Sequence, residues 1–121
     1  MKPFTYTNLS DLVCLKVSIE LCLAYRLRNR DLYVETEKAV PVIFEEIKLE
    51  CGYRCDIVVE KKVMVEIKSI EALAPVHTAQ VLTYLRFLNL RYGLLLNFNT
   101  FLLKDGIKRI VNGFETNKII T

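Results

Sequence analysis

Long apolar runs are missing from this sequence of 121 residues. No stretch reaches the ~18 apolar residues that a membrane-spanning helix requires, and the most apolar segment, residues 13–25, is interrupted by Lys16 and Glu20. The first ten residues lack the apolar centre of a secretory signal. With only four glycines and three prolines, the chain is neither collagen-like nor of low complexity. We therefore expect a soluble, cytoplasmic protein that does not enter a membrane.

The usual metal-binding patterns of cysteine and histidine are missing as well. The sequence has one histidine, His77, and its four cysteines form no C-x-x-C pair: Cys14, Cys22, Cys51 and Cys55. We interpret the cysteines as reduced thiols that fill apolar space, and His77 as a helix-capping or surface residue. A single sign of charge does not dominate, because 17 basic and 14 acidic residues give a net charge of +3. That balance permits nucleic acid as a partner without requiring it.

The length and the apolar pattern indicate one domain, residues 1–121, that mixes helices and strands. One helix is predicted from an N-cap at Ser10 to about residue 30, and a second from Pro75 to residue 89 or 90. Between and after these helices we expect short strands at residues 34–38, 39–44, 47–51, 53–59, 63–68, 92–98 and 107–111. This order predicts an α/β or α+β fold, with a mixed central sheet flanked by helices.

The most informative segment is residues 55–69, CDIVVEKKVMVEIKS. If residues 60–62 form the loop of a hairpin, Asp56 lies directly opposite Glu66, with Cβ atoms ~4.5–5.5 Å apart. Lys68 shares the face of these two acids, and the alternate residues form an apolar, β-branched face that belongs in the core. The hairpin therefore brings two carboxylates and one amine together.

Two facing carboxylates repel each other unless a cation neutralises them, and Mg²⁺ is typically held by one or two carboxylates. A metal site at Asp56 and Glu66 is therefore one interpretation. The equally weighted alternative is a surface patch in which Lys68 pairs with one of the acids. A loop of two residues would move Asp56 to the other face and remove the metal site.

Polar residues on both predicted helices add to this constellation. His77, Gln80 and Tyr84 fall at i, i+3 and i+7, on one stripe of the second helix. Glu20 interrupts an apolar part of the first helix. Taken alone, the stripe is typical of a polar helix flank. Glu20 is either a solvent-facing residue at the edge of an apolar face, which is the favoured interpretation, or an acid that is buried for a specific reason.

The order of these residues resembles a known enzyme superfamily. Asp56, then Glu66-x-Lys68 on the next strand, then Gln80-x-x-x-Tyr84 on the following helix, is similar to the PD-(D/E)xK nucleases. The Q-x-x-x-Y element is similar to that of their RecB-like branch.

A closer resemblance, over about residues 19–114, is to the small prokaryotic GxxExxY proteins. It is carried by LAYRLRNR, EIKSIEALAPVHTAQVLTYL, GLLLNFN and LLKDGIKRIVNG. The motif that names the family, G-x-x-E-x-x-Y, is absent from the chain.

The resemblance implies a restriction-endonuclease-like αβββαβ core with a metal site at the end of the central hairpin. It implies that Asp56 and Glu66 bind Mg²⁺ or Mn²⁺, together with the backbone carbonyl of Ile67. Glu20 matches an acid that members often carry on the first helix, which makes it a further candidate ligand.

The same resemblance implies that Lys68 positions or activates the attacking water, that Gln80 orients near the site and that Tyr84 supports it. We therefore expect a metal-dependent nuclease that hydrolyses phosphodiester bonds, with DNA favoured over RNA. The alternative is a catalytically inactive nuclease-fold module that binds nucleic acid or a protein partner. A homodimer formed through the apolar first helix is also open.

Overall fold

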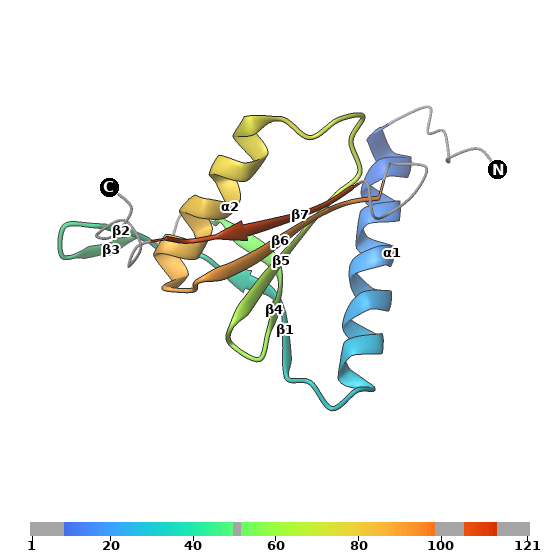
Figure 1. The fold of residues 1–121 in the computed structure, drawn as a ribbon, viewed down its shortest axis with the longest axis horizontal. Helices are drawn as coiled ribbons and strands as arrows, with labels where there is room; N and C mark the ends of the chain where they lie inside the picture. The colour runs from blue at the N-terminus through green and yellow to red at the C-terminus, as the bar shows by residue number, and fades with distance from the viewer. Residues whose placement is uncertain (1–8, 50–51, 99–105, 114–121) are drawn as a thin grey trace.

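A computed structural model describes residues 9–49, 52–98 and 106–113 of the protein, and Figure 1 shows how its helices and strands are arranged. The elements in chain order are α1 (Leu9–Arg28), β1 (Val34–Ala39), β2 (Val42–Phe44), β3 (Ile47–Leu49), β4 (Arg54–Val59), β5 (Val63–Lys68), α2 (Pro75–Leu88), β6 (Tyr92–Asn97) and β7 (Ile107–Val111). No helix in these ranges is long and apolar enough to cross a membrane.

Five of the strands form one mixed sheet in the order β1-β4-β5-β6-β7. The pairs β1–β4, β4–β5 and β6–β7 are antiparallel, whereas β5 and β6 run parallel. Parallel neighbours need a crossover, and α2 provides it. Helix α1 packs on one face of the sheet and α2 on the other, as Figure 1 shows. This architecture confirms the predicted mixed α/β class with helices flanking a mixed sheet.

Both faces of the central hairpin are buried, one under each helix. The β-branched face of Ile57, Val65 and Ile67 packs with Ala24 of α1, as the alternation predicts. The opposite face is apolar as well, because Val58 and Met64 are 1% and 0% exposed and pack with residues of α2. The carboxylates of this hairpin therefore lie at the end of a doubly covered sheet rather than on an open face.

A close approach between α2 and β6 fixes the position of the second helix. A Cβ atom on Gly93 would lie 2.9 Å from Val81 Cγ1 and 3.2 Å from Leu85 Cδ1, so only glycine lets the helix lie this close to the strand. After β5, the Asn97 side chain accepts a hydrogen bond from Ile70 N (3.1 Å) and donates one to Ile70 O (3.0 Å). The loop that leads from β5 into α2 is thus held at a defined place.

Three details of the sequence prediction are wrong. Helix α1 already includes Leu9, so Ser10 lies inside the helix and is not its N-cap, and the helix ends at Arg28 rather than about residue 30. The segment 39–44 is not one strand, because Pro41 has no N–H to donate and the chain leaves the sheet there. Its second half, β2, pairs with β3 in a separate two-stranded sheet.

Candidate active site

The hairpin of β4 and β5 has the predicted register. Val59 pairs with Val63, and Val58 with Met64, so residues 60–62 form the loop. Glu60 and Lys61 both take φ of 53°, and Lys62 N donates to Val59 O (2.9 Å), which closes the turn. The register places the start of β4 beside the end of β5, and this is the end of the hairpin that carries the site.

Asp56 lies where the regular ladder is interrupted. Strand β1 pairs Thr36 with Ile57 and Lys38 with Cys55, but the intervening Glu37 has φ of 50° and forms no regular pair with Asp56. The ladder between β4 and β5 also ends at Ile57, one residue before the expected pair of Asp56 and Glu66. The predicted pairing of Asp56 directly opposite Glu66 is therefore wrong, although the two carboxylates lie close enough for the charge of Asp56 to raise the pKa of Glu66.

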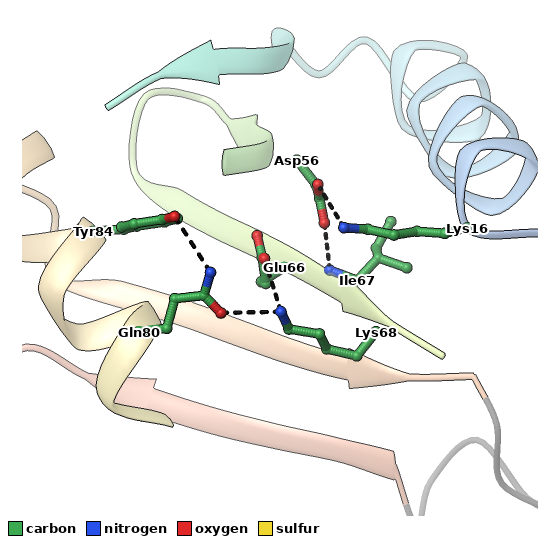
Figure 2. A network of polar contacts seen from close by, with 7 residues as sticks. All are labelled: Lys16, Asp56, Glu66, Ile67, Lys68, Gln80 and Tyr84. Atoms are coloured by element: carbon green, nitrogen blue, oxygen red, sulfur yellow. Dashed lines mark hydrogen bonds and ion pairs between the residues drawn. The ribbon is translucent and has the colours of Figure 1, made fainter. Parts of the chain in front are cut away.

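The carboxylate of Asp56 has two partners. Its Oδ2 accepts a hydrogen bond from Ile67 N (2.7 Å), and its Oδ1 lies 3.4 Å from Lys16 Nζ of helix α1. Figure 2 shows both contacts. Asp56 is 5% exposed, so these contacts hold a buried negative charge. The part of Ile67 that contacts Asp56 is its N–H group, and a metal contact from its carbonyl stays a prediction.

Glu66 is the least satisfied polar group of the site. It is 3% exposed, and its Oε2 lies 3.5 Å from Lys68 Nζ. Its other oxygen, Oε1, is buried and has no hydrogen-bond partner among the residues that the structure describes. The pKa of Glu66 is raised to about 7, mainly by burial and then by the nearby charge of Asp56, while the charge of Lys68 acts in the opposite direction. A buried carboxylate oxygen without a partner is costly in a folded protein and favours a site for a cation.

Helix α2 continues the network from Lys68. Gln80 Oε1 accepts a hydrogen bond from Lys68 Nζ (3.0 Å), and Gln80 Nε2 donates one to Tyr84 Oη (3.3 Å). Figure 2 shows this chain of side chains leading from Glu66 through Lys68 and Gln80 to Tyr84. The structure therefore brings together the predicted residues of the hairpin and of the helix.

His77 lies on the same helix but outside this network. Its Nδ1 accepts a hydrogen bond from Ala74 N (2.8 Å) at the start of α2. His77 N in turn donates to Ala74 O (2.9 Å). The side chain thus satisfies a backbone N–H group at the helix start, which agrees with the capping interpretation.

Glu20 of α1 reaches the site from the other face of the sheet. It is 7% exposed, and ligand atoms of Glu20, Glu37 and Asp56 all lie within 4.8 Å of one another. Burial is the main cause that raises the pKa of Glu20 to about 8, followed by a hydrogen bond with Glu37 and by the charges of Glu37 and Asp56. The prediction that Glu20 is a solvent-facing residue is therefore wrong, whereas its place beside Asp56 agrees with the resemblance.

Sequence reasoning missed three residues of the site: Lys16, Glu37 and Tyr53. All three line one hollow of about 510 Å³ together with Glu20 and Asp56. Lys16 had a detectable signal, because it precedes Glu20 by four residues and so lies on the same side of the helix. Glu37 and Tyr53 gave no signal in the sequence. The position of Glu37 depends on its positive φ, and that of Tyr53 depends on where β4 begins.

The donor atoms of the site fit a hard divalent cation. They are carboxylate oxygens, which Mg²⁺ and Mn²⁺ prefer, and one of them on Glu66 has no other partner. The nearby thiol of Cys55 does not compete, because burial raises its pKa to about 12 and keeps it protonated. Cys22 is exposed, so the prediction that it fills apolar space is wrong for this residue. The buried Cys55 agrees with that prediction, whereas the side chains of Cys14 and Cys51 lie outside the described part of the structure.

The stability of the metal-free protein is expected to fall as the pH rises from about 5 to 8. Glu20 has a pKa of about 8 in the folded protein, whereas the ordinary pKa of a glutamate is 4.5. The folded state therefore binds more protons than the unfolded chain in this range, so stability is lost until Glu20 ionises in the folded protein. Glu66, with its pKa of about 7, contributes in the same direction at lower pH.

Melting temperatures measured in EDTA across this pH range check the prediction. Glu20→Gln should reduce the slope most clearly near pH 8, where Glu66 is mostly ionised. Glu71→Gln, which changes an exposed acid, should leave the slope as in the wild type. A slope that is the same in Glu20→Gln as in the wild type would contradict the prediction.

Comparison with known proteins agrees with this geometry. Residues 13–110 match a family model described as the PD-(D/E)XK nuclease superfamily. Searches of curated proteins and of solved structures found no match. The matched region contains α2, the central hairpin, all of α1 except its first four residues, and every residue of the network in Figure 2. This chain belongs to the PD-(D/E)XK nuclease superfamily.

Proposed function

We propose that this domain is a nuclease that hydrolyses phosphodiester bonds of nucleic acid with the help of Mg²⁺ or Mn²⁺. The observation that carries the proposal is the buried Oε1 of Glu66, which has no hydrogen-bond partner in the described part of the chain, on a carboxyl group whose pKa the charge of Asp56 raises. A protein retains such an arrangement at a cost in stability, and a bound cation removes that cost. Membership of the superfamily agrees with this chemistry.

In this proposal Asp56 and Glu66 hold the cation, and the carbonyl of Ile67 and the carboxylate of Glu20 are further ligands. The bound ion supplies Lewis-acid activation of the scissile phosphate. Lys68 positions the attacking water or stabilises negative charge that develops on the phosphate. The hydrogen bond from Lys68 Nζ to Gln80 (3.0 Å) supports this role, because it directs the amine toward the site.

Several narrower statements belong to the same proposal. The motifs favour the GxxExxY family and the RecB-like branch, with Gln80 and Tyr84 as the Q-x-x-x-Y element. DNA is proposed as the substrate in preference to RNA, and the cytoplasm as the location. A homodimer or a protein partner would supply sequence specificity, because a domain of this size offers only ~600–1,000 Å² for contacts to nucleic acid.

Metal binding and cleavage test the proposal together. Mn²⁺ binding would be measured by calorimetry at about pH 8.5, where Glu66 is ionised, since its pKa is about 7. Cleavage of single- and double-stranded DNA and RNA would be followed with Mg²⁺, Mn²⁺ or EDTA. Glu66→Gln keeps the shape of the side chain and removes its charge, and is expected to weaken Mn²⁺ binding by roughly tenfold or more and to abolish cleavage.

Glu71→Gln is the matched control, because it removes one exposed acidic charge near the end of the same hairpin. Equal Mn²⁺ affinity of Glu66→Gln and the wild type would overturn the metal site. If the wild type binds both Mn²⁺ and nucleic acid but cleaves no substrate, the domain is a non-catalytic binding module and the enzymatic proposal fails.

A further inference from the structure

The hollow beside Asp56 has an aromatic edge that the proposed chemistry does not use. Tyr53, directly before β4, lines this hollow and is 51% exposed. Its ring centroid lies 6.2 Å from that of Tyr84, at an interplanar angle of 37°. Tyr84 is 9% exposed and is held by the hydrogen bond from Gln80, so it supports Tyr53 from the protein side. Much of the Tyr53 side chain therefore stays open to solvent.

The backbone holds Tyr53 in this position. Its carbonyl accepts a hydrogen bond from Val40 N (2.8 Å), next to the start of the β1–β4 pairing. Gly52, before it, has φ of +80°, and a Cβ atom there would have no neighbour within 4 Å. Among the described residues, the space beside Gly52 is therefore open, and the hydrogen bond of the Tyr53 carbonyl fixes the backbone from which the ring projects.

The hollow offers basic side chains that can attract phosphates and, next to them, an aromatic surface for an uncharged ring. Lys16 and Arg54 line it and supply positive charge, while the buried Asp56 and the exposed Glu37 supply negative charge. A nucleobase carries no charge and stacks favourably on an exposed tyrosine. Phosphates of the same strand would be attracted to the two basic side chains.

From this arrangement we infer that the domain binds a single-stranded segment of nucleic acid, with one unpaired base stacked on Tyr53. In a duplex the faces of the bases are covered by their neighbours, so only a single strand or an opened end presents a base to this ring. The inference rests on the proposed nuclease function and names its substrate class: nucleic acid that is unpaired at the cleavage site.

The test measures binding rather than cleavage, so that it can fail independently of the enzymatic proposal. A fluorescent single strand of about 12 thymidine nucleotides and its duplex would be titrated with the protein in EDTA and in Ca²⁺, and anisotropy recorded. A second strand of the same length with abasic sites keeps the phosphates and lacks the bases. Tyr53→Ala is expected to weaken binding of the thymidine strand by roughly tenfold, as for the loss of one stacked base.

Tyr53→Phe keeps the ring and should bind like the wild type, which also shows that the position tolerates substitution. Tyr25→Ala is the matched control, because this tyrosine of α1 is 65% exposed but does not line the hollow. The abasic strand should bind wild type and Tyr53→Ala equally.

Three results would overturn the inference: unchanged binding of the thymidine strand by Tyr53→Ala, equal loss for the thymidine and abasic strands, or a wild type that prefers the duplex. If cleavage persists in any of these cases, the stacking role is wrong and the nuclease proposal stands. If the wild type is cleavage-inactive but shows the expected pattern of binding, the stacking role stands and the enzymatic proposal is wrong.

Discussion

Lys68→Met is expected to lower metal-dependent cleavage by roughly 10²–10³-fold, the loss typical of removing one charged group that stabilises a transition state. The substitution keeps an unbranched side chain of similar length in a half-buried position and removes its charge. Lys68 Nζ lies 3.5 Å from Glu66 Oε2 and 3.0 Å from Gln80 Oε1. Methionine cannot make either contact, so the site loses its amine while the hairpin stays intact.

Metal affinity separates this role from a general loss of the site. Mn²⁺ should bind Lys68→Met at least as tightly as the wild type at about pH 8.5, because the ammonium no longer competes for Glu66. The pH must be held high, since Lys68 lowers the pKa of Glu66 and its removal raises that pKa further above about 7. Single-turnover cleavage rates at saturating metal check the prediction.

The control for Lys68→Met is Lys62→Met, which removes an exposed lysine from the loop of the same hairpin. It should cleave at the rate of the wild type, because a change of one unit in net charge alone has little effect on the chemistry. Cleavage by Lys68→Met within about threefold of the wild type would contradict the role given to this lysine.

Leu85→Ala is expected to destabilise the protein by about 2–5 kcal/mol. Leu85 is 0% exposed and lies in the core cluster between α2 and the sheet. It packs over Gly93, whose place for a Cβ atom is 3.2 Å from Leu85 Cδ1. Because glycine has no side chain that could move into the space, the cavity left by alanine is poorly filled, which favours the upper part of this range.

Urea denaturation followed by circular dichroism measures this loss. Val76→Ala is the control, because Val76 lies on the same helix with 67% exposure and its truncation should change the free energy of unfolding by less than about 0.5 kcal/mol. A loss below about 1 kcal/mol for Leu85→Ala would show that the contact between α2 and β6 is looser than described.

The central hairpin and helix α2 were predictable because their signals are local. The loop of residues 60–62 sets the register of β4 and β5. The face made of β-branched residues determines which side chains of the two strands point into the same part of the core. Pro75 marks the first turn of α2. Local signals of this kind place Glu66, Lys68, Gln80 and Tyr84 without any knowledge of the tertiary structure.

The environment of Asp56 was not predictable for the opposite reason. Its partner Lys16 comes from a helix far away in the sequence. The neighbouring carboxylate belongs to Glu37, whose own backbone takes φ of 50°. Neither the docking of a helix nor a positive φ at a glutamate can be read from residue types. The same holds for segment 39–44, where apolar residues favour a strand but Pro41 diverts the chain.

The ion pair between Lys16 and Asp56 bears on whether the protein can fold before it binds a metal ion. It gives a buried carboxylate a counter-ion from the chain itself, at 3.4 Å, so folding does not have to wait for a metal. For the proposed metal-dependent nuclease, folding and metal binding would then be separate steps, unlike in zinc fingers, where the metal is needed for the fold. A divalent ion held by Asp56 would replace the ammonium group of Lys16, and the positive charge of Lys16 would then be free to attract the backbone of a nucleic-acid strand at the hollow.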